Sequence, residues 1–111
     1  EGGVATALHE IADACQCGLK IVEEHIIYLP ESRLLCEYSG IEVLGAISSG
    51  ALLVVTPPEN VFELLKAYEM AGIPAADIGC LTDSTDRRIL ISGDASLDLP
   101  RFDRDEITRI F

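Results

Sequence analysis

The stretch SSGALLVVTPPENVFELLKAYEMAG, residues 48–72, decides the fold that we expect for this chain. Its residues 51–55 form a continuous apolar run that is too short for a helix. The run is rich in the branched side chains that suit a strand covered on both faces. We therefore predict that residues 51–55 form the central strand of a sheet.

The second half of the same stretch predicts an amphipathic helix. Pro58 suits its first turn, because proline lacks an amide hydrogen that the first turn leaves unpaired. Gly72 then ends the helix in the usual way. Apolar side chains recur at helical spacing at Val61, Leu64, Leu65 and Tyr68, and the charged residues fall mostly on the other side. We expect the apolar side of this helix to pack against the sheet.

The residues before this stretch predict a helix, a strand and a second helix. An apolar stripe at Val4, Leu8, Ile11 and Cys15 indicates a helix that begins almost at residue 1 and ends before Gly18. Residues 19–24 read as a strand, and Pro30 begins a short helix that Gly40 ends. Because domains rarely begin inside a helix cap, we expect the chain to be the cut end of a longer polypeptide.

The residues after the stretch predict a hairpin and a last helix. Residues 75–81 and 87–92 read as two antiparallel strands joined by a polar turn. Residues 93–100 read as a turn-rich loop. Asp103 with Glu106 three residues later matches a capping box for a C-terminal helix that docks on the domain.

This order of elements predicts one α/β (α+β) domain spanning residues 1–111, with a layered mixed sheet, flanking helices and a partly ferredoxin-like arrangement. Nineteen acidic residues against eight basic ones give a formal net charge of −11. This charge repels nucleic acid and anionic membranes, so we expect neither as a partner. No apolar run approaches the roughly 20 residues that span a bilayer, and no signal peptide is present, so we expect a cytoplasmic protein.

The four cysteines do not have the spacing of a structural zinc site. Cys15 and Cys17 form a single pair, and Cys36 and Cys80 stand alone. We expect free thiols that act as small apolar residues in or near the core, and no metal site. His25 beside two carboxylates is a candidate base, but an exposed strand end is the commoner reason for such a cluster. No catalytic constellation stands out.

Two glycine-containing segments are candidates for binding a phosphate or nucleotide. Gly2 and Gly3 at the start of the first helix offer backbone amides to an anion at what we expect to be an exposed cap, and Thr6 adds a hydroxyl. The same glycines also suit a tight entry and close packing. Ser48, Ser49 and Gly50 can hold an anion or simply turn the chain.

Several stretches together resemble the C-terminal domain of the aminoimidazole ribonucleotide synthetase superfamily. They are EGGVATALHEIA at residues 1–12, SSGALL at 48–53, PPEN at 57–60 and AGI at 71–73 leading to Ile78 and Gly79. Their fixed order and spacing extend the resemblance over nearly the whole chain. Within the superfamily, the opening GGVATAL is most similar to the hydrogenase expression/formation (maturation) proteins.

The resemblance implies a C-terminal module that closes over a cleft for ATP or a phosphorylated substrate. In such proteins an N-terminal domain carries most of the ligands for ATP and Mg²⁺. The implied partners are therefore the protein's own N-terminal domain, a second copy in a homodimer and a hydrogenase maturation partner. The implied enzyme is of the synthetase or ligase type, and we expect this chain to be inactive alone.

One departure from the family pattern keeps the substrate open. Hydrogenase maturation proteins of this kind end in a short tail with a terminal cysteine that accepts the carbamoyl group. This chain ends at Thr108-Arg109-Ile110-Phe111, so we do not carry carbamoyl dehydration over to it. The alternative interpretation is a stand-alone ferredoxin-like module for ligand binding or oligomerisation. A third interpretation is a metal or redox site formed by the cysteines.

Overall fold

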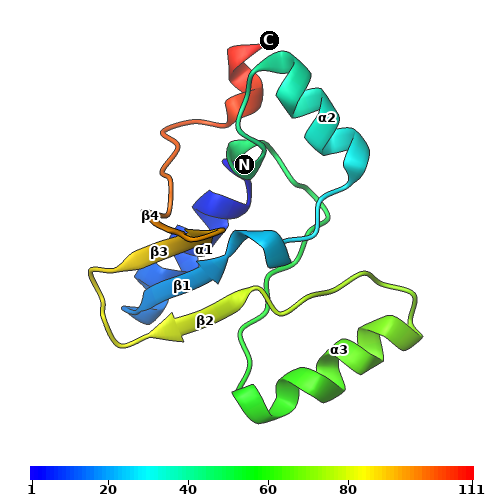
Figure 1. Ribbon diagram of the computed structural model, residues 1–111, viewed down its shortest axis with the longest axis vertical. Coiled ribbons are helices and arrows are strands. Elements are labelled where there is room, and N and C mark those ends of the chain that lie inside the picture. The colour runs from blue at the N-terminus through cyan, green and yellow to red at the C-terminus, as the bar shows by residue number, and fades with distance from the viewer.

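The computed structural model describes residues 1–111 and contains a four-stranded mixed sheet with flanking helices (Figure 1). Strand β1 (Gly18–Val22) pairs antiparallel with β2 (Gly79–Thr82) on one side and parallel with β3 (Arg88–Ser92) on the other. Strand β4 (Ala95–Asp98) pairs antiparallel with β3 at the far edge. The predicted α/β class with a mixed sheet is confirmed.

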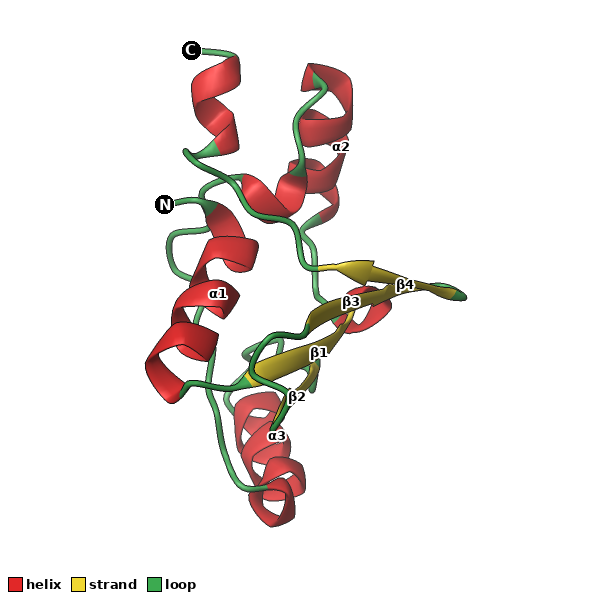
Figure 2. Cartoon of the chain, turned by 90° about the vertical axis from the view of Figure 1, so that its left-hand side faces the viewer, coloured by secondary structure: helices red, strands yellow, loops and turns green.

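Helix α1 (Gly3–Cys15) covers one face of the sheet (Figure 2). Its alanines at positions 5 and 12 are both 0% exposed, and such small side chains let the helix approach the strands closely. The main core joins this helix to the sheet and to the chain that follows it, through Ala5, Leu8, Ala12, Leu19, Ile21, Leu44, Leu90 and Leu99. The predicted first helix and its buried stripe are confirmed at Leu8, whereas Cys15 is exposed.

A second, smaller core lies among elements that Figure 1 shows above the sheet. It forms between α2 (Pro30–Ser39), the short 3₁₀ turn Val43–Gly45 and the C-terminal 3₁₀ turn Glu106–Arg109. Its buried members are Cys36, Ile41 and Ala46, and Val43 and Ile107 pack against them. The C-terminal segment is therefore docked as predicted, although as a 3₁₀ turn rather than a helix.

The prediction that residues 51–55 form the central buried strand is wrong. These residues run as an open connection with no strand pairing, and Leu52 is 76% exposed. The central position belongs to β1, where Leu19 and Ile21 are buried. An apolar run is necessary for a central strand but not sufficient, because the strand also needs neighbours that pair with its backbone.

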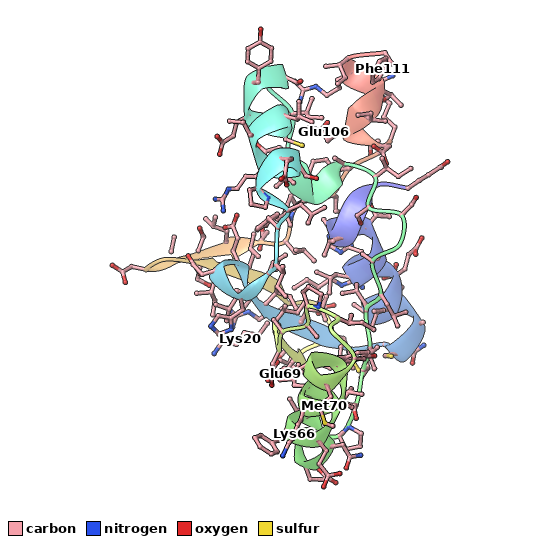
Figure 3. All side chains as sticks on the ribbon, turned by 90° about the vertical axis from the view of Figure 1, so that its right-hand side faces the viewer. Lys20, Lys66, Glu69, Met70, Glu106 and Phe111 are labelled. Atoms are coloured by element: carbon pink, nitrogen blue, oxygen red, sulfur yellow. The ribbon has the colours of Figure 1, made fainter.

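Helix α3 (Val61–Met70) forms as predicted, after a 3₁₀ turn at Pro58–Asn60. It contains no buried residue, so its expected packing against the sheet is not observed. Figure 1 shows it standing below the sheet, beyond β2. Its side chains Lys66, Glu69 and Met70 lie at the opposite end of the molecule from Glu106 (Figure 3).

The predicted hairpin between residues 75–81 and 87–92 is also wrong, because β1 lies between β2 and β3. The hairpin of this sheet is β3 with β4, where the sequence predicted a turn-rich loop. Burial explains the arrangement. Inserting β1 between the two strands places Leu19 and Ile21 at the centre of the sheet, under α1.

His9 ties α1 to the chain that follows β4. Its Nε2 lies 3.2 Å from the Leu99 carbonyl oxygen and 3.0 Å from that of Pro100. Its Nδ1 lies 3.0 Å from Nη1 of Arg88, which is always a donor, so Nδ1 accepts and Nε2 carries the proton of a neutral ring. Burial lowers the pKa of His9, the charges of Arg101 and Arg88 act in the same direction, and the two carbonyl groups oppose them.

A matched pair of leucine substitutions separates the observed core from the predicted one. We expect Leu19→Ala, at a side chain 2% exposed, to lower the free energy of unfolding by about 2–5 kcal/mol. Leu52→Ala, at a side chain 76% exposed, should change it by less than about 0.5 kcal/mol. Urea denaturation of both variants provides the measurement. Equal losses at the two positions would contradict this core.

The lowered pKa of His9 predicts a pH-dependent stability. The unfolded chain binds the proton at higher pH than the folded chain does, so stability is present above the ordinary histidine pKa of about 6.5 and is lost as the pH falls through the folded value. The slope for one proton cannot exceed about 1.4 kcal/mol per pH unit. His9→Gln should flatten this slope in unfolding titrations between about pH 5 and 7. The control is the exposed His25→Gln, which should keep the wild-type profile.

Candidate functional site

The start of α1 is built from two glycines in left-handed backbone conformations. Gly2 has φ of 74° and Gly3 of 70°, and both residues are buried. A Cβ atom on Gly3 would lie 2.3 Å from the Leu44 carbonyl oxygen, so Gly3 is needed for packing against the turn at Val43–Gly45. The expectation that Gly3 sits at an exposed cap is therefore wrong.

The first turn of α1 is rich in unused hydrogen-bond donors. No side chain caps the helix, and the amides of Gly3, Val4 and Ala5 make no hydrogen bond. Unpaired amides and the helix dipole together give this end a partial positive charge. Thr6 lies beside Gly2, because a Cβ atom added to Gly2 would be 2.3 Å from the hydroxyl oxygen of Thr6. This end of the helix is suited to an anion.

The carboxylate of Asp105 is the anion that the chain itself places at this end. The Gly2 amide donates to Oδ2 at 2.8 Å, and the amides of Ile47 and Ile107 donate to Oδ1 at 3.1 and 3.0 Å. Asp105 thus also caps the C-terminal 3₁₀ turn, and the predicted cap at Asp103 is wrong. The capping residue is Asp105, which lies two residues after the predicted Asp103.

These three amides stabilise the ionised form of Asp105. Burial alone would raise its pKa, but the hydrogen bonds from Ile107, Gly2 and Ile47 outweigh burial and hold the pKa of Asp105 below its ordinary value. The group is buried in a chain with a large excess of negative charge. Backbone amides, rather than a basic side chain, therefore hold the ionised carboxylate of Asp105 in place.

The neighbouring Glu106 closes the same corner from the other side. Its Oε1 accepts a hydrogen bond from the Glu42 amide at 3.0 Å and from Nη1 of Arg109 at 2.9 Å. The Glu42 amide is the main cause that lowers the pKa of Glu106. Figure 3 shows this side chain between α2 and the C-terminal turn. The sequence did not identify Asp105 or Glu106 as a site residue. Glu106 was predicted only as part of a capping box.

The second predicted segment, Ser48, Ser49 and Gly50, forms an exposed turn close to the first. The Ala51 amide donates to the Ser48 carbonyl oxygen at 3.0 Å, and Gly50 has φ of 94°. Ile47, next to Ser48, shares the Asp105 carboxylate with Gly2. Ser48 also lines an apolar groove of about 380 Å³ together with Val4 of α1. The structure therefore brings the two predicted segments to the same corner.

The other candidate groups do not join this corner. His25 is exposed. All four cysteines are free, but only Cys36 is buried, so the expectation of core thiols is wrong for exposed Cys15 and Cys80. Burial raises the pKa of the Cys36 thiol. No group of three or more His, Cys, Asp or Glu side chains is arranged to hold a metal ion. None of the helices combines the length and apolar character that crossing a bilayer requires.

Comparison with curated proteins finds relatives among two kinds of enzyme. Carbamoyl dehydratase HypE of Rhizobium leguminosarum bv. viciae is 38% identical over 80 residues, which are 70% of this chain and 23% of the relative. Phosphoribosylformylglycinamidine synthase subunit PurL of Corynebacterium glutamicum (strain R) is 29% identical over 106 residues, which are 95% of this chain and 13% of the relative. The chain thus spans less than a third of the length of either relative.

Solved structures extend the similarity to the fold. A crystal structure of Escherichia coli HypE covers 100% of this chain and 35% of its own, with a TM-score of 0.83 and 28% identity. A crystal structure of a HypE–HypF complex covers 91% of this chain and 34% of its own, with a TM-score of 0.76 and 30% identity. The family model described as AIR synthase related protein, C-terminal domain, matches residues 1–91. The chain therefore belongs to the family of C-terminal domains of AIR synthase related proteins.

Proposed function

We propose that this chain is the C-terminal module of an ATP-dependent, synthetase-like protein and closes over a cleft that binds ATP or a phosphorylated substrate. One observation carries the proposal: the uncapped N-terminus of α1, with unpaired amides at Gly3, Val4 and Ala5, lies beside amides that already hold an anionic group. Membership of the AIR synthase related family supports the same function.

A phosphate group would reach this corner beside Thr6, which is partly exposed and offers a hydroxyl. The exposed turn of Ser48, Ser49 and Gly50 borders the same corner, whereas Gly2 and Gly3 are packed against Thr6 and Leu44. Attraction comes from amides and the helix dipole, because the net charge of −11 repels anions at long range. Asp105 keeps the two segments together, so its carboxylate positions the site rather than contacting the ligand.

The chemistry we propose is phosphoryl transfer from ATP to a substrate oxygen, which converts that oxygen into a better leaving group. Bound Mg²⁺ would neutralise charge on the transferred phosphoryl group. We assign most of the ATP and Mg²⁺ ligands to an N-terminal domain outside residues 1–111. The share of each relative that the chain covers, about a third or less, supports a further domain.

The proposed partners are this N-terminal domain, a second copy of the complete protein and a hydrogenase maturation protein, in the cytoplasm. The last of these rests on the similarity of the chain to a crystal structure of a HypE–HypF complex. A stand-alone interaction module remains the second candidate. It is favoured by the exposed apolar side chains of α3, such as Phe62 at 75%.

A hydroxyl deletion tests the phosphate site without disturbing the core. Gly3→Val is unsuited to this, because the added side chain would collide with the Leu44 carbonyl oxygen and unfold the corner. In the complete polypeptide, we expect Thr6→Val to weaken ATP binding by about 10- to 150-fold, the effect of losing one hydrogen bond to a charged group, which is worth about 1.5–3 kcal/mol. Calorimetry measures the affinity, and the thermal midpoint should stay close to that of the wild type.

Thr85→Val, at an exposed threonine between β2 and β3, is the matched control and should leave ATP affinity unchanged. If Thr6→Val and Thr85→Val bind ATP equally well, Thr6 has no role in the site. If the complete wild-type polypeptide binds no ATP, the proposed function itself is wrong.

A further inference from the structure

Two cysteines stand at the junction between α1 and β1. Cys15 is the last residue of α1, Cys17 directly precedes β1, and only Gln16 separates the two. Both thiols are free; Cys15 is exposed and Cys17 is partly exposed. Figure 2 shows this short connection at the end of the helix. The pair is therefore accessible to a reactant from the solvent.

The backbone at this junction turns back over the helix. Gln16 has a left-handed conformation with φ of 53° and ψ of 46°. The Cys17 amide donates to the Ala12 carbonyl oxygen at 3.1 Å, which is the hydrogen bond of a Schellman turn. The thiol of Cys17 also points back, since its Sγ donates to the Cys15 carbonyl oxygen at 3.2 Å. The turn thus places the Cys17 thiol beside the backbone of Cys15.

The spacing of the two cysteines suits a disulfide. A left-handed helical residue separates the Cα atoms of its neighbours by the same distance as a right-handed one, about 5.4 Å for a helix of radius about 2.3 Å and rise about 1.5 Å. Disulfides join Cα atoms that are about 4.4–6.8 Å apart. Because Cys15 is exposed, its side chain is free to exchange between staggered rotamers. A bond between the two sulfur atoms is therefore within reach without displacing the core.

We propose that Cys15 and Cys17 form a reversible dithiol–disulfide site that exchanges with a low-molecular-weight disulfide such as oxidised glutathione. An exposed disulfide is labile, which suits a reversible site. The inference goes beyond the proposed function and does not rest on it. The pair lies at the opposite end of α1 from the phosphate corner, about 18 Å away along the helix axis.

The difference in exposure gives the two thiols different steps. Cys15, as the thiolate, attacks one sulfur atom of the incoming disulfide, forms a mixed disulfide and releases one thiolate, which takes up a proton. Cys17, as the thiolate, then attacks the Cys15 sulfur atom and releases the second thiolate, which is also protonated. The protein loses two electrons and two protons, and these reduce the incoming disulfide to two thiols.

The other two cysteines have no such neighbour. Cys80 of β2 lies opposite Lys20 of β1. Lys20 is three residues after Cys17, which is about 10 Å along an extended strand and too far for a disulfide. Cys36 is buried in the second core. Exposed Cys80 is therefore limited to a mixed disulfide and provides an internal control.

A glutathione titration of the complete polypeptide tests the inference without any substitution. After the remaining thiols are blocked, trypsin separates the cysteines of residues 1–111, because it cleaves after Lys20, Arg33, Lys66 and Arg87. Cys15 and Cys17 stay on one fragment, in which an internal disulfide appears as the loss of two hydrogen atoms in mass spectrometry. Cys36 and Cys80 fall on two other fragments.

The stoichiometry of exchange gives the expected result. Forming the internal disulfide releases two molecules of reduced glutathione. At constant oxidised glutathione, a tenfold increase in reduced glutathione should therefore lower the ratio of disulfide to dithiol about 100-fold. The mixed disulfide at Cys80 should fall only about tenfold. Separate glutathione adducts on Cys15 and Cys17, a bond from either to another cysteine, or no oxidation of the pair would overturn the proposal.

A matched pair of substitutions assigns the two steps. In Cys17→Ser, the mixed disulfide at Cys15 should accumulate and should depend only about tenfold on reduced glutathione. Cys80→Ser should keep the 100-fold dependence of the wild type, about as steep as two released thiols require. Equal behaviour of Cys17→Ser and Cys80→Ser would overturn the proposal.

Discussion

The carboxylate of Asp105 is the contact on which the arrangement of the candidate site depends. It accepts hydrogen bonds from Gly2 before α1, from Ile47 before the exposed turn and from Ile107 in the C-terminal 3₁₀ turn. Segments that are 58 and 103 residues away along the sequence are thereby fixed at one point. Without an acceptor here, the buried Gly2 amide would lose its partner, which costs about 1–3 kcal/mol, and the partly buried amides of Ile47 and Ile107 would lose theirs as well.

The same contact shows how backbone amides hold an anionic group in a strongly acidic chain. Basic side chains are scarce, so the donors at this corner are backbone amides, and α1 adds its dipole. Asp105 accepts a hydrogen bond from the Gly2 amide just before the helix, whereas the amides of Gly3, Val4 and Ala5 remain unpaired. Folding and the proposed binding of an anion would thus use neighbouring donors of the same kind. A substitution at the corner would affect both unless it is confined to a side chain such as Thr6.

Local patterns in the sequence predicted the elements that depend on local chemistry. The helices α1, α2 and α3 follow from apolar spacing and from Pro30, Pro58 and Gly40. The errors concern pairing and partners. Residues 51–55 have the composition of a strand but no neighbouring strand. Strand β1 lies between β2 and β3, although it is distant from both in the sequence, and local patterns do not reveal such pairing. Asp105 was missed because its partners, Gly2 and Ile47, are remote, and Asp103 fits the local capping pattern equally well.

The most direct test of this account is the stability of Asp105→Asn across pH. The amide nitrogen cannot accept from a backbone amide, so unfolding by urea at pH 7 should show a loss of about 1–3 kcal/mol. Because the folded pKa of Asp105 is lowered, its contribution is present above the ordinary value of about 3.9 and is lost as the pH falls through the folded value, so the difference from the wild type should shrink toward pH 2. The exposed Asp103→Asn is the control and should match the wild type. Equal stability of Asp105→Asn and Asp103→Asn at pH 7 would contradict the account.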